Sequence, residues 1–423
     1  MAKKAAEPKK TRSWGGDEAR NAAEFFTKQT NDAIAKNVDS FIGAKSEKIC
    51  IGIPLGAFSL RYLYGSDSYL LGRVELIIGE SGCCKTAFMF EQMRWFMMMP
   101  GGGACYELNE PRDPGDLRRS IIDGQMLDTS FNLHGPHQSV EDWQRSITGT
   151  MHALENMYKE RGGCAFPIYL GLDSLAGTTN ERTISNIDET GCAALTFGHD
   201  ALLFKQYFQY LPPKLARWPI SWSCTNHIKF KTNKYGHPVV TIPGGDHLRY
   251  AASYITYMKR GKDITRQSVS GGYEINMEMI KVQGQKRELT VEFAWSFEGT
   301  QQRSWWDWDS ASIQLLMKPP AQSAEAVHDL ISFDARVSHR TTTCKKLGIG
   351  RQAPYHEVGR ALMDPQNSAL LGALQSALGI KTRKAYQPGL IYSEQITQAL
   401  AEGAVEVEDA AIDPSVRIEG EQE

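Results

Sequence analysis

The chain has 423 residues, a formal net charge of -2 and a sequence pI near 6.6. This length exceeds what one ordinary hydrophobic core holds, so it predicts one large domain with terminal additions, or two domains. The near-neutral charge excludes a uniformly basic nucleic-acid coat, so any contact with DNA must come from a local basic patch.

The cysteine pattern and the hydropathy indicate the cellular compartment. The 8 cysteines form no CxxC pair, and no histidines join them at zinc-site spacing. No apolar run approaches the roughly 20 residues of a membrane-spanning helix, and no signal-peptide core opens the chain. We therefore expect a cytoplasmic protein in a reducing environment, with no membrane partner.

Residues 1–46 are predicted to form a basic arm followed by a helix. The arm carries Lys3, Lys4, Lys9, Lys10 and Arg12 among residues too small and polar to bury a core. From Asp17 to about Lys36, apolar residues recur at helical spacing behind an acidic start. This helix packs either on its own domain or on a neighbouring subunit, and we take oligomerisation as its working role.

Between Cys50 and Trp306, short apolar runs alternate with longer amphipathic ones. This pattern is typical of an α/β core with a doubly wound, mostly parallel sheet, which we assign to residues 47–318. The predicted core strands are Val74–Ile78, Ala104–Leu108, Ile168–Leu172, Ile220–Cys224, Tyr254–Lys259 and Leu289–Phe293. The predicted helices are Lys85–Met98, Val140–Arg161 and His199–Leu211, the last ended by Pro212 and Pro213.

Two adjacent prolines, Pro319 and Pro320, predict a boundary after the core. Residues 319–423 are predicted to form a small accessory region with helical stretches near Ala321–Phe333 and Ser368–Leu378. From Glu402 onward, eight acidic residues face a single arginine, which predicts a solvated acidic tail.

A strand, a tight loop and a helix meet at Gly79-Glu80-Ser81-Gly82-Cys83-Cys84-Lys85-Thr86. The spacing matches the P-loop motif G-x-x-x-x-G-K-[ST], except that Cys84 stands in place of the second glycine. Backbone N–H groups of such a loop cradle phosphates, while Lys85 reaches the β and γ oxygens and Thr86 binds Mg²⁺. We therefore predict that these eight residues bind ATP with Mg²⁺. The Cβ of Cys84 would crowd the nucleotide or force an unfavourable backbone angle. Both fast and slow hydrolysis of ATP therefore stay open.

Two acidic residues that follow apolar runs complete the predicted site. Asp173 ends one run and would hold a water on the Mg²⁺ ion that Thr86 also binds. Glu110 ends another and would polarise the attacking water as the catalytic carboxylate. Strand alternation turns Glu107 to the opposite side, which favours Glu110 for this role. For each acid, a solvated loop carboxylate is the alternative.

From Ile51 to Glu298 the chain resembles the RecA/RadA recombinases, in a series of segments that follow the family's order. The matching segments are Ala57–Gly65 and Leu71–Val74 before the P-loop, Tyr106–Glu110, Asp113-Pro114, Asp173-Ser174, Cys224–Lys229 and Pro243–Ser253. The resemblance implies a RecA-like P-loop core in which Asp113 lies at the adenine side. It also implies that His227 stands where a polar residue, usually glutamine, senses the γ-phosphate. A histidine there adds pH sensitivity, unless it is an ordinary residue at a strand end.

The resemblance also indicates where DNA and neighbouring subunits would bind. The segment between Cys224–Lys229 and Pro243–Ser253 corresponds to the family's second DNA-binding loop, and its lysines and aromatic rings suit phosphates and unstacked bases. The predicted contacts are Lys229, Phe230, Lys231, Lys234, Tyr235, Gly244 and Gly245, with Arg182 in the first DNA loop. A solvated basic loop is the alternative. By position, Lys281 and Lys286 would reach the ATP of a neighbouring subunit.

The resemblance implies a DNA-dependent ATPase that forms a helical homo-oligomeric filament on single-stranded DNA. In the family such a filament pairs its strand with homologous duplex DNA during recombination and repair. Two alternatives stay open: a hexameric helicase-like motor with the same core, and a hydrolysis-poor scaffold that coats DNA. Cys84 and His227 depart from the family's pattern and indicate a divergent lineage, such as that of a large bacteriophage.

Overall fold

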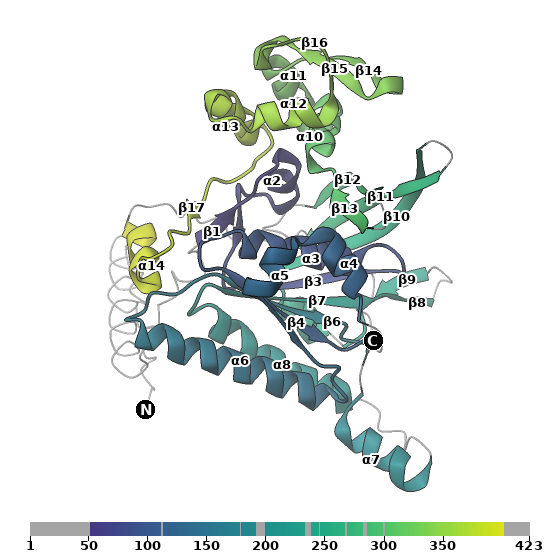
Figure 1. Cartoon of the computed structure of the whole chain (residues 1–423), viewed down its shortest axis with the longest axis vertical. Helices are drawn as coiled ribbons and strands as arrows, with labels where there is room; N and C mark the ends of the chain where they lie inside the picture. Colours follow the sequence, from purple (N-terminus) through teal and green to yellow (C-terminus); the bar gives the residue numbers. More distant parts are fainter. Residues whose placement is uncertain are drawn as a thin grey trace, which may run out of the picture. The chain divides into compact units, whose positions relative to one another are not determined.

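The computed structural model of the chain describes residues 51–110, 113–177, 179–191, 199–232, 238–244, 246–266, 269–281, 286–298 and 301–401 (Figure 1). They belong to a unit that runs from Cys50 to Glu423. The predicted basic arm, the predicted helix over Asp17–Lys36 and the acidic tail from Glu402 onward lie outside the described residues. Within the described part, no helix has the length and apolar character needed to cross a lipid bilayer.

A nine-stranded sheet forms the centre of the fold, in the order β13-β12-β11-β10-β3-β7-β6-β4-β5. Its parallel part consists of β3 (Val74–Gly79), β4 (Gly103–Leu108), β5 (Phe131–His134), β6 (Ile168–Asp173), β7 (Ile220–His227) and β10 (Tyr254–Arg266). Three antiparallel strands continue it from β10: β11 (Val269–Lys281), β12 (Arg287–Glu298) and β13 (Gln301–Trp306). The fold is therefore α/β, with a large mixed sheet of mostly parallel strands.

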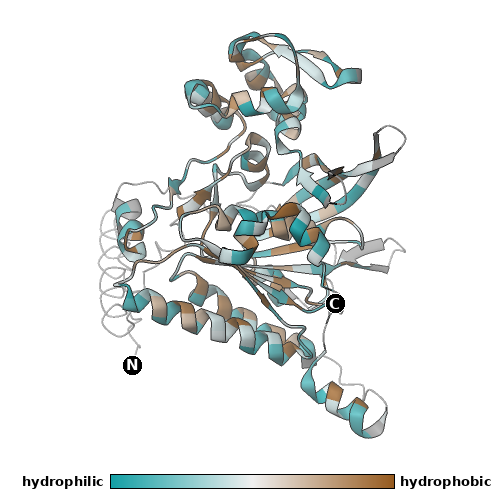
Figure 2. Cartoon of the chain, viewed as in Figure 1, coloured by the Kyte–Doolittle hydropathy of each residue, from teal (hydrophilic) through white to brown (hydrophobic). Residues whose placement is uncertain are grey.

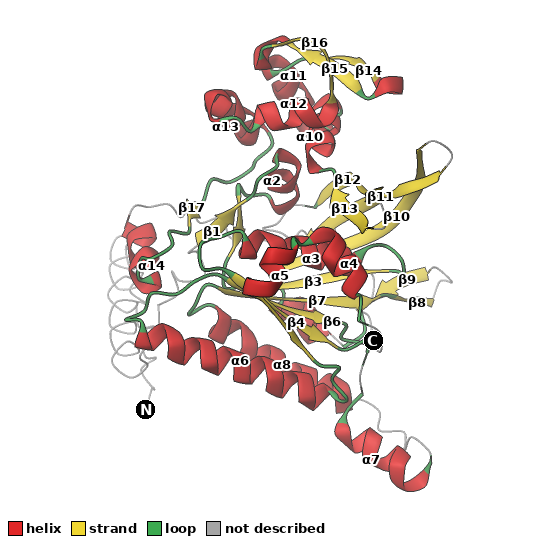
Figure 3. Cartoon of the chain, in the orientation of Figure 1, coloured by secondary structure: helices red, strands yellow, loops and turns green. Residues whose placement is uncertain are grey.

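The predicted core strands all lie within strands of this sheet. The strand predicted over Leu289–Phe293 belongs to β12, however, and runs antiparallel to β11 instead of extending the parallel part. β11 was not predicted from the sequence, although Ile275, Met277 and Met279 alternate with more exposed residues and are buried. Because β10 pairs with β3 only as far as Met258, the β10–β11 hairpin extends beyond β3 (Figure 3).

Helices cover both faces of the sheet (Figure 1). They are α2 (Phe58–Tyr64), α3 (Lys85–Met97), α4 (Gly115–Ile121), α5 (Gly124–Ser130), α6 (Val140–Glu160), α8 (His199–Leu215) and α9 (Asp246–Ala251). The helix α7 (Glu181–Thr190) projects away from the sheet (Figure 1). On β4, the ring of Tyr106 lies 5.1 Å from that of Phe90 on α3, whereas Glu107 contacts Ser146 on α6. Since adjacent strand residues face opposite sides, α3 and α6 cover opposite faces. Figure 2 shows hydrophobic residues along the central strands and on these helices.

The predicted helices α3 and α6 are confirmed, but α8 continues through Pro212 and Pro213 to Leu215. The prediction that these prolines end the helix at Leu211 is therefore wrong. Proline lacks an N–H donor but holds φ near the helical value, so helical backbone can continue at the cost of hydrogen bonds. Leu211 and Leu215 are fully buried, and the N–H of Ala216 donates to the carbonyl of Pro212. Packing of the last turn outweighs the missing hydrogen bonds.

After α10 (Trp308–Met317), the chain forms a smaller group of elements. They are α11 (Ala324–Leu330), β14 (Asp334–Arg336), β15 (Thr341–Cys344), β16 (Ile349–Pro354), α12 (Tyr355–Leu362), α13 (Ser368–Ala377), β17 (Lys384–Ala385) and α14 (Tyr392–Ala401). The helix predicted near Ala321–Phe333 is a 3-10 turn followed by α11, and it ends at Leu330. The sequence did not predict the antiparallel sheet of β14, β15 and β16.

The C-terminal elements are tied to the core by backbone pairing and by a buried arginine. β17 pairs in parallel with β1 (Ile51–Pro54), which pairs antiparallel with β2 (Ser68–Leu70). Arg287, only 5 % exposed, donates to the carbonyls of Tyr62 at 3.1 Å, Leu378 at 3.2 Å and Gly379 at 2.8 Å. The segment after α13 is therefore held against α2 and β12.

Candidate phosphate-binding site

The loop of the motif, from Gly79 to Thr86, joins the carboxyl end of β3 to the amino end of α3, as the motif predicts. It is called the phosphate loop below. Cys84 precedes the helix with φ 65° and ψ 27°, in the left-handed region that residues with a Cβ rarely adopt. Gly82 also has a positive φ, of 76°. At Gly79, an added Cβ would come within 2.3 Å of the carbonyl oxygen of Met258, so no side chain fits there. The unfavourable backbone angle expected for Cys84 is confirmed.

Lys85 turns back into the phosphate loop. Its Nζ donates to the carbonyls of Gly79 at 3.1 Å and Glu80 at 2.7 Å, and the residue is 8 % exposed. The buried thiol of Cys83 also donates to the Glu80 carbonyl, at 3.0 Å. Burial raises the pKa of the Cys83 thiol, and it raises the pKa of the half-buried Cys84 thiol to about 12. Both thiols are therefore neutral near pH 7, and Lys85 supplies the positive charge of the loop.

Three hydroxyl groups converge on the carboxylate of Asp173 at the end of β6, where it is 5 % exposed. Oδ2 accepts from Thr86 Oγ1 at 2.7 Å and from the Tyr106 hydroxyl at 3.0 Å, and Oδ1 accepts from Thr225 Oγ1. These donors come from α3, β4 and β7, so three separate elements orient one carboxylate. The two residues predicted to hold Mg²⁺ are thus adjacent.

Glu110 lies close to Asp173. Its N–H donates to the backbone carbonyl of Asp173 at 3.1 Å, and the Ser174 hydroxyl donates to its Oε1 at 2.7 Å. The peptide bond between Asp173 and Ser174 is cis. The half-buried Glu110 carboxylate therefore lies at the same edge of the sheet as Asp173 and Thr86.

Glu107 faces the opposite side of the sheet, as strand alternation predicts. Its fully buried carboxylate accepts from His134 Nδ1 at 2.8 Å, His137 Nε2 at 2.6 Å and Ser146 Oγ at 2.8 Å. Burial acts to raise the Glu107 pKa, but the hydrogen bonds from the histidines outweigh it and lower the pKa. The hydrogen bond to Glu107 raises the pKa of His134. This cluster joins β4, β5 and α6, and it was not predicted from the sequence.

A second buried carboxylate lies behind the phosphate loop. Glu75 on β3 is fully buried and accepts from Tyr69 at 3.0 Å, Gln92 at 2.8 Å and Thr256 at 2.7 Å. The Tyr64 hydroxyl donates to both of its oxygens, at 3.1 and 3.3 Å. All four partners are uncharged. Burial consequently raises the pKa of Glu75 to about 7.

β7 carries His227 to the edge of the phosphate loop, because His227 and Gly79 are register partners in the adjacent strands β7 and β3. His227 is half-buried. Two residues later begins β8 (Lys229–Thr232), which pairs antiparallel with β9 (Pro238–Thr241). The segment predicted to be a loop is therefore partly a β-hairpin, because β-branched residues such as Val239 and Val240 favour strand pairing.

The structure describes the predicted DNA contacts only in part. Lys229 is exposed at the start of β8. Phe230 and Lys231 belong to β8, but their side chains lie outside the described part. Lys234, Tyr235 and Gly245 lie wholly outside it.

Three further predicted residues are described individually. Gly244 has φ 102°, and an added Cβ would meet Leu248 Cδ1 at 2.3 Å. Arg182 is exposed in the first turn of α7. Asp113, predicted at the adenine side, forms an ion pair with Arg118 of α4 at 2.9 Å. No hydrogen bond or ion pair within the described residues joins these three residues to the phosphate loop.

Lys281 and Lys286 have partners within their own chain. Nζ of Lys281 donates to the backbone carbonyls of Arg249 at 2.8 Å and Tyr250 at 3.2 Å, both in α9. Burial lowers the pKa of Lys281. Lys286 forms ion pairs with Glu278 at 3.2 Å and Glu288 at 2.9 Å. Their predicted reach to a neighbouring subunit stays a prediction.

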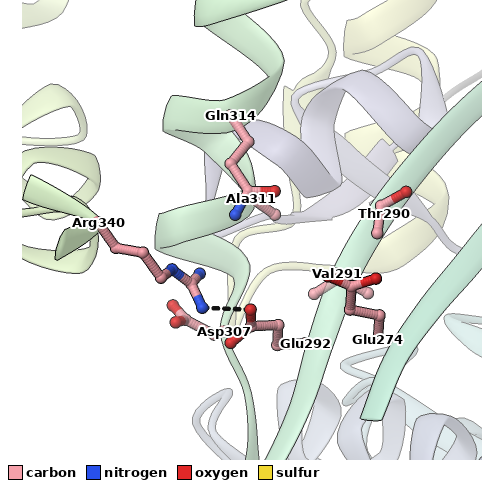
Figure 4. Close-up of a pocket in the computed structure, with 8 residues that line it drawn as sticks. All are labelled: Glu274, Thr290, Val291, Glu292, Asp307, Ala311, Gln314 and Arg340. Carbon is pink, nitrogen blue, oxygen red and sulfur yellow. Dashed lines mark hydrogen bonds and ion pairs between the residues drawn. The ribbon is translucent and has the colours of Figure 1, made fainter. Parts of the chain in front are cut away.

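A small recess lies elsewhere, between β11, β12 and α10 (Figure 4). Arg340 reaches it from the C-terminal elements and forms an ion pair with Glu292. None of its lining residues belongs to the phosphate loop or to the β8–β9 hairpin. It therefore adds nothing to the site predicted from the sequence.

No protein-family model matches the chain, and no curated protein matches its sequence. Its function is therefore inferred from the geometry above and from the resemblance of its motifs.

Proposed function

We propose that the chain is an ATP-dependent recombinase of the RecA/RadA type, which forms a filament on single-stranded DNA and pairs it with homologous duplex DNA. The observation that carries this proposal is the register of β3 and β7, which sets His227 beside Gly79. The β8–β9 hairpin begins two residues further on. A nucleotide on the phosphate loop and DNA on the hairpin would therefore contact neighbouring strands at their carboxyl ends, where α/β sheets bind ligands.

The phosphate loop fits a nucleoside triphosphate. It leaves no room for a side chain at Gly79, and the amino end of α3 offers backbone N–H groups to an anion. Lys85 can exchange the two loop carbonyls that it now contacts for phosphate oxygens. These features support ATP as the ligand.

Thr86 and Asp173 fit Mg²⁺. This ion takes one or two protein oxygens and completes its shell with phosphate oxygens and water. Thr86 Oγ1 and Asp173 Oδ2 lie 2.7 Å apart and offer two such oxygen ligands. When bound, Mg²⁺-ATP supplies the phosphoryl group to be transferred, with its charge partly neutralised by the metal.

Glu110 fits the role of the general base. An ionised carboxylate at this edge of the sheet can accept the proton of a water that attacks the γ-phosphate. The hydrogen bond from Ser174 orients the Glu110 carboxylate. Glu107 is unsuited to this role, because its carboxylate is bound to two histidines on the other face.

The hairpin suits single-stranded DNA by its chemistry. Its segment offers Lys229, Lys231 and Lys234 for phosphates, and Phe230 and Tyr235 for stacking with bases. In a filament, Lys281 and Lys286 would have to leave their present partners to reach a neighbour's ATP.

The proposal is tested by nucleotide-dependent DNA binding of Lys85→Ala. Fluorescence anisotropy of a labelled oligo(dT) gives the affinity with and without ATP and Mg²⁺. We expect ATP to tighten DNA binding of the parent about tenfold or more, as for typical coupling of two sites. Lys85→Ala should show no ATP effect, because the phosphates lose their cation. Lys318→Ala, which removes an exposed lysine outside the site, is the matched control. Equal DNA binding of the parent with and without ATP would reject the proposal.

The backbone of Cys84 favours a second candidate, a hydrolysis-poor scaffold that coats DNA. A left-handed residue with a Cβ in the phosphate loop is a reason for slow turnover. A scaffold would show ATP-stimulated DNA binding without phosphate release, whether DNA is present or not. A recombinase would release phosphate faster with single-stranded DNA.

A further inference from the structure

The end of β7 contacts both the predicted metal site and the base of the hairpin, through two adjacent side chains. Thr225 and Asn226 are each 1 % exposed. The Thr225 hydroxyl donates to Asp173 Oδ1, and Asn226 Nδ2 donates to the carbonyl of Pro243 at 2.8 Å. Pro243 follows β9 and precedes Gly244, so it closes the hairpin segment that β8 opens. Both contacts lie within two residues of His227.

On the side of the metal site, Thr225 completes a short chain of hydrogen bonds. Asp173 accepts from Thr86 on one carboxylate oxygen and from Thr225 on the other. An ionised carboxylate only accepts, so both hydroxyls must donate to it. The backbone also joins the two strands here, because the N–H of Leu175 donates to the Thr225 carbonyl at 3.1 Å. A displacement of the Asp173 carboxylate would therefore shift the end of β7 at Thr225.

On the side of the hairpin, the amide of Asn226 has an unused acceptor. Its Oδ1 is buried and has no hydrogen-bond partner in the described part of the chain. A buried polar atom without a hydrogen-bond partner costs free energy. An amide held by one hydrogen bond can exchange it for another arrangement when Pro243 moves. Such a side chain is suited to a segment with two positions.

We propose that Thr225 and Asn226 are positioning residues that couple the Asp173 carboxylate to the base of the β8–β9 hairpin. The inference rests on the proposed function and deepens it, because coupling between ATP and DNA then does not depend on His227 alone. Thr225 holds the carboxylate that faces Thr86, and Asn226 holds the residue that ends the hairpin. A displacement at one side chain reaches the other through the backbone of β7, because Thr225 and Asn226 are consecutive residues of this strand.

Variants of Thr225 separate the hydroxyl from the packing of the side chain. Thr225→Val keeps the shape and removes the donor, whereas Thr225→Ser keeps the donor. We measure two quantities: the Mg²⁺ concentration at half-saturation of fluorescent ATP binding, and the ratio of oligo(dT) affinities with and without a non-hydrolysable ATP analogue. Thr225→Val should raise the first and lower the second about tenfold, as expected for losing one hydrogen bond to a charged group. Thr225→Ser should restore both.

Asn226→Ala tests the hairpin side, and Ser221→Ala is the matched control. Asn226→Ala should lower the ratio of DNA affinities about tenfold, because Pro243 loses its donor. Ser221 is equally buried on β7, but its hydroxyl faces the Leu70 carbonyl at 3.5 Å, so Ser221→Ala should keep the parent's ratio. Circular dichroism confirms that each variant is folded.

The outcomes distinguish this inference from the proposed function. If ATP tightens DNA binding of the parent and Thr225→Val and Asn226→Ala keep the full ratio, the inference is overturned and the proposed function stands. If Thr225→Ser behaves like Thr225→Val, packing and not the hydroxyl is responsible, which also overturns the inference. If the parent itself shows no ATP effect, both fail.

Discussion

Cys84 has the least favourable backbone conformation in the phosphate loop. A residue with a Cβ in the left-handed region carries a steric cost of about 1–2 kcal/mol relative to its preferred conformation. The loop keeps this angle because β3 enters it at Gly79, where no side chain fits, and Lys85 opens α3 immediately afterwards. Cysteine in place of the motif's glycine therefore adds a steric cost to the loop, because Cys84 adopts a left-handed backbone angle.

Cys84→Gly should raise the free energy of unfolding by about 1 kcal/mol, because glycine adopts φ 65° without a Cβ clash. The gain stays below the full steric cost, since glycine has more conformational freedom in the unfolded chain. Urea unfolding followed by circular dichroism measures it. Cys83→Gly is the control and should destabilise, because Cys83 is buried and has no positive φ. A Cys84→Gly variant less stable than the parent would contradict this account of the loop.

The Glu75 cluster joins β3, the strand that enters the phosphate loop, to four neighbouring elements. Its donors come from α2, β2, α3 and β10, and all are buried. Four uncharged donors stabilise the carboxylate, but they do not fully replace water, so the pKa of Glu75 stays near 7. The cluster therefore holds its proton more tightly in the folded chain than in the unfolded one.

Glu75→Gln should remove a part of the pH dependence of stability. Because the folded pKa of about 7 lies above the ordinary 4.5, the stabilisation is complete below pH 4.5 and is lost as the pH rises through 7. Between pH 5 and pH 8 this group should lower the free energy of unfolding of the parent by about 2–3 kcal/mol. Urea unfolding at both pH values, compared between parent and variant, isolates the effect. Glu325→Gln, at an exposed position, should keep the parent's pH dependence. An unchanged pH dependence in Glu75→Gln would show that Glu75 is ionised throughout.

Elements were predictable where local sequence decides the structure. The core strands were found because they are buried apolar runs, and α3 and α6 because their ends are well marked. The end of α8 was not, since packing of Leu211 and Leu215 overrides the proline signal. β11 was not predicted, because its buried residues alternate with more exposed ones and form no continuous apolar run.

At the scale of the whole molecule, the sequence motifs identified the phosphate loop, Asp173 and Glu110, but not the contacts that orient them. Thr86 and Asp173 are 87 positions apart, and Asp173 and Thr225 are 52 apart. Such contacts depend on strand order and register, which propensity and spacing do not define. The hydroxyls of Tyr106 and Thr225 and the Glu107 cluster therefore became visible only with the fold.

Charge is also distributed unevenly over the whole chain. Residues 402–423 contain eight acidic residues and one arginine, a formal charge of -7, and the complete chain has -2. Residues 1–401 therefore carry +5, the difference between -2 and -7. If the chain binds DNA as proposed, the acidic tail would compete with DNA for basic residues, which include those of the hairpin segment.

A chain that ends at Ala401 should bind single-stranded DNA more tightly than the parent at low salt, because the competing negative charge is gone. The difference should shrink as salt rises, since screening shortens the reach of charges from about 10 Å at 0.1 M to about 3 Å at 1 M. Anisotropy titrations of labelled oligo(dT) over a salt series, with ATP present, measure both effects. A full-length variant with the eight tail acids changed to Gln or Asn separates charge from length and should match the truncated chain. Equal affinities of parent and truncated chain at low salt would exclude a masking role for the tail, and a neutral tail that still weakens binding would assign the effect to length.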